Sequence, residues 1–104
     1  MTNERFGVFA TTTSDDDRRG FHIKFENGFT VSIQWGRGIY NGPTTAEVGA
    51  WDNKGVWLRL GDGDDVLGYQ SPEKVAELLS HVAALPSDAV KIGFAWDSDQ
   101  QLFV

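Results

Sequence analysis

The sequence predicts an α+β fold in a single domain spanning residues 1–104, a twisted antiparallel sheet of about six to eight short strands with one helix packed on it. Apolar and polar residues alternate on both sides of Asn27-Gly28, which is typical of a β-hairpin. Several other short alternating runs are separated by turn residues. One segment, from about Pro72 to Leu85, has apolar residues at helical spacing, so one helix is expected.

The chain begins with a strand and a polar segment. Apolar residues alternate from Phe6 to Ala10, which predicts the first strand. The polar run from Thr11 to Arg19 predicts a long exposed loop and contains three consecutive aspartates. A second acidic segment lies at Gly61 to Asp65. We interpret both acidic segments as solvated turns; the alternative is an acidic surface that imitates nucleic acid.

The central hairpin, from Gly20 to Trp35, admits two registers, and its hydrophobic pattern decides between them. A two-residue turn at Asn27-Gly28 would mix apolar with polar side chains on both faces. A three-residue loop with Gly28 in the left-handed conformation makes one face wholly apolar. In that register the apolar pairs are Phe25 with Phe29, Ile23 with Val31, and Phe21 with Ile33. We therefore predict the three-residue loop, with one dry and one wet face.

A second hairpin is expected further along the chain. Its arms are Thr44 to Trp51 and Val56 to Leu60, and they flank a connection that ends in Gly55, where a positive φ is needed. The alternation along these arms is less regular than in the central hairpin. Val66 to Gln70 then predicts a short strand.

The predicted helix has clear start and stop signals. Ser71 is a suitable N-cap, Pro72 suits the first helical position, and Glu73 places an acid in the first turn. Pro86 ends the helix. The side chains expected to face water are Lys74, Glu77 and Ser80. The apolar stripe expected to lie on the sheet consists of Val75, Leu78, Leu79, Val82 and Leu85.

Two more strands are predicted after the helix. Apolar residues alternate from Val90 to Trp96, which predicts an extended strand. Asp97 to Gln100 then forms a turn. Leu102 to Val104 is expected to be an edge strand that ties down the end of the sequence.

Composition excludes several classes of function. The sequence has no cysteine, which excludes disulfides, thiolate metal sites and a cysteine nucleophile, and which suits a reducing compartment. Fifteen acidic and nine basic residues give a net charge of −6, so direct binding to the phosphate backbone of DNA or RNA is not expected. The apolar runs are too short to span a membrane and no signal peptide is recognised, so we expect a soluble protein without membrane partners.

The sequence shows no catalytic or metal-binding constellation. The two histidines, His22 and His81, have no serine, acid or second histidine at a spacing that predicts a site. Three acids between Asp62 and Glu73 match a calcium loop, but Val66 and Leu67 occupy positions where a ligand and a glycine are required. We therefore predict no catalytic residue, no metal and no cofactor.

The glycine-rich loop after the central hairpin is the one place where a ligand site can be argued. Within seven residues it brings together a planar aromatic, an arginine, a phenol and an amide. Such groups suit a nucleotide or another planar anionic ligand, which would stack on the aromatic rings and pair with the arginine. The predicted ligand-binding residues are Trp35, Arg37, Tyr40 and Asn41.

The same block resembles a known group of proteins. From Gly20 to Gly38, and less strongly at Glu47 to Asp52 and Val66 to Glu73, the sequence is similar to small proteins carried by tailed bacteriophages, a group without a firmly assigned activity. Small, acidic, cysteine-free phage proteins are often accessory factors that bind and disable a host protein or sequester a defence signal. The resemblance thus implies an anti-defence or host-takeover role in the host cytoplasm.

Three functional hypotheses follow. The leading one is a non-catalytic phage accessory protein that binds and inhibits a host protein through an aromatic and acidic surface, since four tryptophans and seven phenylalanines exceed what a small core readily hides. The alternative is a sponge that sequesters a nucleotide signal with the Trp35 to Asn41 loop, as a homo-oligomer with pockets at subunit junctions. A small hydrolase is the second alternative, with the fewest residues in its favour.

Overall fold

The computed structural model describes residues 6–12, 17–36, 42–61 and 65–104. Five strands form an antiparallel sheet in which each strand pairs with the next along the chain: β1 (Phe6–Thr12), β2 (Asp17–Lys24), β3 (Thr30–Gly36), β4 (Gly42–Trp51) and β5 (Val66–Gln70). Two helices and a two-stranded antiparallel sheet follow: α1 (Pro72–Ala83), α2 (Ala89–Ile92), β6 (Trp96–Asp97) and β7 (Leu102–Phe103). The α+β class is therefore confirmed.

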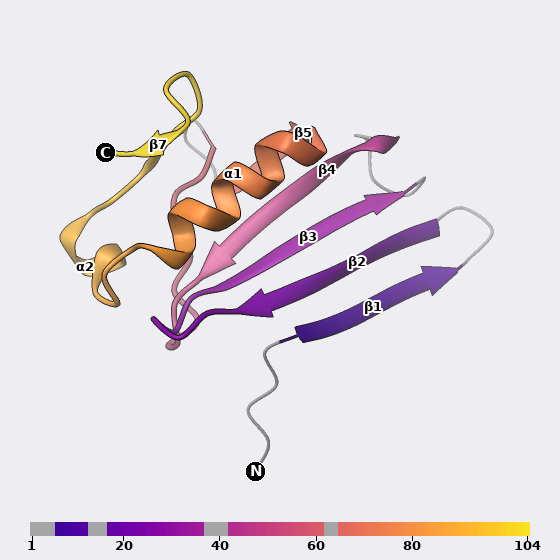
Figure 1. Ribbon diagram of the computed structural model, residues 1–104. Coiled ribbons are helices and arrows are strands. Elements are labelled where there is room, and N and C mark those ends of the chain that lie inside the picture. Colours follow the sequence, from indigo (N-terminus) through magenta and orange to yellow (C-terminus); the bar gives the residue numbers. More distant parts are fainter. Residues whose placement is uncertain (1–5, 13–16, 37–41, 62–64) are drawn as a thin grey trace, which may run out of the picture.

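The long helix lies on one face of the five-stranded sheet. Figure 1 shows α1 running across this face, with α2 and β7 on the side of the molecule away from β1. α1 contacts β3, β4 and β5 of the large sheet, and β7 of the small one. The opposite face of the large sheet carries no helix in the described part of the chain. The two faces of the sheet thus have different surroundings.

The register predicted for the central hairpin is confirmed. Phe21 pairs with Ile33 and Ile23 with Val31 across β2 and β3. The Phe25 N–H donates to the Phe29 carbonyl at 2.8 Å, which closes the three-residue loop. Gly28 has a φ of 95°, in the left-handed region that glycine tolerates and other residues rarely adopt. The hydrophobic pattern was sufficient to select this register because a shift by one residue would have reversed every side chain.

The prediction of six to eight strands in one sheet is wrong, because the described part of the chain places five there. The exposed loop predicted from Thr11 to Arg19 is also shorter than expected, since β1 and β2 stay paired out to Thr12 and Asp17. Residues 13–16 lie outside the described residues. Hydrogen bonding to a neighbouring strand extends these strands through polar residues that have no apolar alternation.

The second arm of the second hairpin, Val56 to Leu60, pairs with β4 only at its start. Its Leu58 N–H donates to the Ala50 carbonyl at 2.8 Å. Further along, the edge of β4 is already paired with β5, so the arm cannot continue there. The arm turns toward the end of the sequence instead, where the Arg59 carbonyl accepts a hydrogen bond from the Trp96 N–H at 2.9 Å. This segment therefore connects the two sheets.

The strand predicted from Val90 to Trp96 is also wrong. Its first residues belong to the one-turn helix α2, which ends where Gly93 takes the left-handed conformation with a φ of 101°. Ile92, which alternation would turn toward the core, is 60% exposed. Glycine directly after a helical turn is a common stop signal, and here it outweighs the two-residue alternation. Ala95 forms an isolated bridge with Arg59, and Trp96 and Asp97 form β6, which pairs with the predicted edge strand, β7.

The start of α1 is confirmed in detail. Ser71 is the N-cap, and its hydroxyl accepts a hydrogen bond from the Lys74 N–H at 3.2 Å. Pro72 begins the helix, where its missing N–H costs no hydrogen bond. The helix ends at Ala83, slightly before the predicted end at Leu85. The three side chains expected to face water, Lys74, Glu77 and Ser80, are exposed.

The central hairpin also holds the end of α1. The Asn27 side chain donates to the carbonyl of Val82 at 2.8 Å and to that of Leu85 at 3.0 Å. Its own oxygen accepts the Phe29 N–H at 3.1 Å, which keeps the side chain in place. The last carbonyls of a helix have no partners within the helix, so this turn residue caps α1 from across the chain. The sequence pattern identified Asn27 only as a turn residue.

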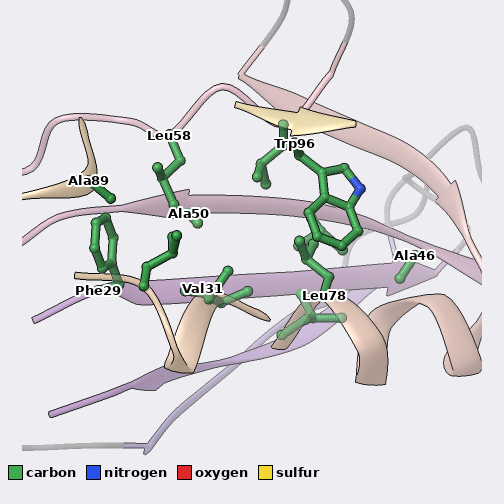
Figure 2. Close-up of a cluster of buried hydrophobic side chains, with 13 residues drawn as sticks. Phe29, Val31, Ala46, Ala50, Leu58, Leu78, Ala89 and Trp96 are labelled. Carbon is green, nitrogen blue, oxygen red and sulfur yellow. The ribbon is translucent and has the colours of Figure 1, made fainter. Parts of the chain in front are cut away.

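The core lies between α1, the covered face of the sheet and the residues that follow α1. Figure 2 shows Phe29, Val31 and Ala50 on the sheet side, opposite Leu78 of α1, with Trp96 packed beside them. The Trp96 ring makes edge contacts with His81 at 5.4 Å and with Phe103 at 4.9 Å between centroids. The buried hydrophobic residues are Phe29, Val31, Ile33, Ala46, Val48, Ala50, Leu58, Leu60, Leu78, Val82, Leu85, Ala89 and Trp96.

Candidate functional site

A pocket of about 420 Å³ opens between one side of α1 and the covered face of the sheet. Strands β3, β4 and β5 supply one side of its lining, and α1 supplies the other. Most of the lining is apolar, and none of the described lining residues is charged. The described lining residues are Ile33, Trp35, Thr45, Ala46, Gln70, Pro72, Val75, Ala76 and Leu79.

The pocket exists because the apolar stripe of α1 is only partly packed. On one side of the stripe, Leu78 and Val82 are fully buried. On the other side, Val75 and Leu79 are only half-buried and line the pocket. Ala46 on the sheet and Ala76 on the helix are small, so neither fills the space between them. The helix thus packs on the sheet along one side of its apolar stripe and leaves apolar surface uncovered along the other.

Trp35 forms the β3 end of the lining. It lies on the same face of the sheet as Ile33, two residues earlier in the strand. Its ring meets the ring of Phe21 on the neighbouring strand in a T-shaped contact, with centroids 6.2 Å apart and an interplanar angle of 71°. This contact restrains the indole in a half-buried position. An aromatic wall of this kind suits a flat apolar ligand.

An irregularity in β5 places Gln70 at the pocket. Val48 pairs with Leu67, so regular pairing would put Tyr69 opposite Ala46. Gln70 takes that position instead, because β5 contains one extra residue there. Tyr69 is turned outward and is 62% exposed, whereas Gln70 is 6% exposed and lines the pocket. This bulge replaces a bulky phenol with an amide at the pocket.

The amide of Gln70 is only partly satisfied. Its Nε2 donates to the Gly68 carbonyl at 3.0 Å. Its Oε1 is buried and accepts no hydrogen bond from the described residues. A buried polar atom without a partner costs free energy and calls for a structural or functional explanation. Gln70 therefore gives this mainly apolar site a hydrogen-bond acceptor that has no partner among the described residues.

The structure places one of the four predicted ligand-binding residues at this pocket. Trp35 lines it, whereas Arg37, Tyr40 and Asn41 lie outside the described residues. The sequence interpretation did not identify Gln70 or the helix side of the site. Val75 and Leu79 were expected to be core, because a stripe at helical spacing does not show which part of it the sheet will cover. The bulge in β5 has no sequence signal of its own, since its left-handed residue is a tyrosine rather than a glycine.

Three further findings concern metal binding, membrane spanning and similarity to known proteins. In residues 6–12, 17–36, 42–61 and 65–104, no three His, Cys, Asp or Glu side chains form a group that could hold a metal ion. No helix in these ranges is long and apolar enough to cross a membrane. Comparisons with protein-family models, curated proteins and solved structures gave no match to the chain.

Proposed function

We propose that the protein is a non-catalytic binding protein that takes a small, mainly apolar ligand into the pocket between α1 and the sheet. The observation that carries this proposal is the 420 Å³ pocket left where the apolar stripe of α1 is not covered by the sheet. Its volume lies in the range of small-molecule sites, about 300–1,000 Å³. Its lining is apolar apart from a few polar groups, which is the usual composition of such sites.

Ligand binding would bury apolar surface that the fold leaves open. Val75 and Leu79 are half-buried, and a ligand between α1 and β4 would cover the rest of their side chains. Removing apolar surface from water is worth about 25 cal/mol per Å². Trp35 would cover another side of the ligand. The proposed chemistry is binding alone, because the described lining residues include the hydroxyl of Thr45 but no histidine, carboxylate or amine that could serve as a general base.

The nucleotide alternative uses the same pocket in part. Trp35 could stack on a nucleobase, and the phosphate would then need the Arg37 side chain, which lies outside the described residues. Within the part of the lining that the structure describes, no residue carries a positive charge for a phosphate. The described lining therefore suits an apolar ligand better than an anionic one.

Filling the pocket from the exposed side of α1 tests the proposal. Ala76 lines the pocket and is exposed, so Ala76→Phe should place a ring in the pocket without disturbing the core. Ala83→Phe, at an exposed position outside the lining at the other end of α1, is the matched control. The thermal stability of wild type and both variants is measured with indole, adenosine and adenosine monophosphate. A ligand at a hundredfold its Kd adds about 2.7 kcal/mol to stability.

We expect at least one of these compounds to raise the melting temperature of wild type and Ala83→Phe, but not of Ala76→Phe. An equal rise in all three proteins would place the site elsewhere. No rise in any of them, with indole and adenosine at millimolar concentration, would contradict the proposal.

A second candidate function is supported by the other face of the sheet. Gly49 points away from α1, since Val48 and Ala50 point into the core. A Cβ on Gly49 would collide with the ring of Trp57, so the absence of a side chain lets this ring lie against the sheet. Trp57 is 44% exposed and contacts the ring of Trp51, with centroids 5.0 Å apart. Exposed tryptophans of this kind are frequent anchors in protein interfaces.

This aromatic pair supports the proposal of a phage accessory protein that binds and inhibits a host protein. Trp57→Ser should abolish retention of a bacterial protein on the immobilised chain, while Glu77→Ala on the exposed side of α1 should not. Equal retention by both variants would remove the aromatic face from consideration. The phage origin, the host cytoplasm and a homo-oligomer stay predictions from the sequence.

A further inference from the structure

We infer that Gln70 selects the ligand, and that the ligand is a neutral planar heterocycle with an N–H donor, such as an indole or a nucleobase. This inference rests on the proposed function, since it names the chemistry of the molecule in the same pocket. It depends on three observations: the bulge that places Gln70, the strain at Tyr69 and the unpartnered amide oxygen.

The bulge keeps the pocket open. Val48 and Ala46 lie on the covered face of β4, two residues apart. Counting from the pair Val48 and Leu67, regular pairing would direct the Tyr69 side chain to this same face, beside Ala46 and into the pocket. The extra residue turns Tyr69 to solvent and brings the slimmer Gln70 beside Ala46. β-Bulges commonly redirect a side chain next to functional sites.

The bulge is maintained against a backbone preference. Tyr69 has a φ of 59°, in the left-handed region where the Cβ of an ordinary residue crowds its own backbone. Glycine usually occupies such positions, and a bulky residue there is a genuine outlier. Strained residues persist where the surrounding structure holds them in place, and they gather at ligand sites. Here the strained residue directly precedes the buried amide.

The amide oxygen specifies the kind of group that a ligand must offer. Nε2 of Gln70 is already bonded to the Gly68 carbonyl, so the unsatisfied atom is an acceptor. This oxygen is buried, but the terminal torsion of glutamine is broad, so the amide can tilt toward a ligand at small cost. A donor that reaches this oxygen meets little competition from water. A ligand without a donor would leave the oxygen unpaired.

The rest of the lining specifies the body of the ligand. Trp35 supplies an aromatic ring held by Phe21, which favours a flat ring. None of the described lining residues is charged, so they suit a neutral molecule better than an ion. Indoles and nucleobases are both flat and neutral, and both carry an N–H. Binding measurements with both classes distinguish these two sources.

The test compares two isomers that differ in the donor. 3-Methylindole keeps the ring N–H, whereas 1-methylindole has the same atoms and replaces the N–H with N–CH₃. Their affinities are measured by calorimetry for wild type and for Gln70→Met, which keeps the length of the side chain and removes the acceptor. Adenosine and 9-methyladenine form a second arm for nucleobases. We expect wild type to bind 3-methylindole roughly tenfold more tightly than 1-methylindole, and Gln70→Met to bind the two about equally.

The outcomes separate this inference from the proposed function. If no indole or nucleobase binds wild type, the pocket itself is rejected as a site for such ligands. If both isomers bind wild type equally, or if the preference persists in Gln70→Met, the pocket stands and the role of Gln70 is rejected. A third measurement does not need the variant to fold. The side-chain amide NMR signal of Gln70 in wild type should shift with 3-methylindole and stay in place with 1-methylindole.

Discussion

The two sides of the apolar stripe of α1 have different surroundings. On one side, Leu78 and Val82 are fully buried, and Asn27 of the central hairpin binds the Val82 carbonyl. On the other side, Val75 and Leu79 face a pocket of about 420 Å³. One side of the stripe therefore stabilises the fold, while the other side provides a surface for a ligand. Helical periodicity describes both sides equally, so the difference comes from what the sheet presents to them.

The largest effect is expected on the packed side of α1. Leu78 is fully buried against the sheet, so Leu78→Ala removes buried methyl groups and leaves a cavity. The free energy of unfolding should fall by about 2–5 kcal/mol in denaturant melts. A loss below about 1 kcal/mol would show that this side of the helix is not the packed one.

The next effect concerns the contact between the hairpin and the end of α1. Asn27→Ala removes the side-chain donor from the carbonyls of Val82 and Leu85, and the acceptor from the Phe29 N–H. The expected loss is about 1–3 kcal/mol, measured by chemical denaturation. Glu26→Ala, at the exposed preceding position, should stay within about 0.5 kcal/mol and serves as the control. Equal losses for the two variants would mean that Asn27 acts only as a turn residue.

A smaller effect is expected on the side of the helix that faces the pocket. Leu79 is half-buried at the pocket, so Leu79→Ala should cost about 1–2 kcal/mol, less than Leu78→Ala. The same variant should weaken the binding of 3-methylindole, because it removes part of the apolar lining. Paired melts and calorimetry on the two leucine variants measure the difference. If Leu79→Ala destabilised the fold as much as Leu78→Ala, the distinction between the two sides of the helix would fail.

The smallest effect concerns the strained residue beside the pocket. Glycine tolerates the φ of 59° at position 69, but it also makes the unfolded chain more flexible. Tyr69→Gly should therefore leave stability unchanged or raise it by up to about 1 kcal/mol, with ligand binding retained. Tyr69→Ala keeps the strain and should be less stable than Tyr69→Gly. The reverse order in thermal melts would show that the backbone at this position is not strained.

Local signals predicted several elements correctly. The start of α1 follows from Ser71 and Pro72, whose effects depend on neighbouring backbone groups alone. The register of the central hairpin follows from its two-residue alternation and from Gly28. The strand predicted from Val90 to Trp96 failed because the glycine stop signal at Gly93 outweighed the two-residue alternation. The second arm of the second hairpin failed to pair along its length because β5 already occupies that edge of β4.

The candidate site could be predicted only in part. Trp35 was identified because an aromatic residue at the end of a strand is visible in the sequence. Gln70 was not, because its position depends on a bulge that is defined by pairing with β4. Asn27 was recognised as a turn residue, and its bonds to α1 join residues 55 and 58 positions apart in the chain. Contacts of this kind arise only when distant segments meet.

The amino-acid order alone therefore determined the α+β class, the central hairpin and the start of α1, since alternation, helical spacing and capping act between residues close in sequence. The meeting of α1 with the sheet decided the rest. It buried Leu78 and Val82 and left Val75 and Leu79 beside an open pocket, while the pairing of β5 with β4 placed Gln70 in the pocket lining. The physical reason is that burial depends on which surfaces face one another, and this is a property of the packed chain rather than of any one segment.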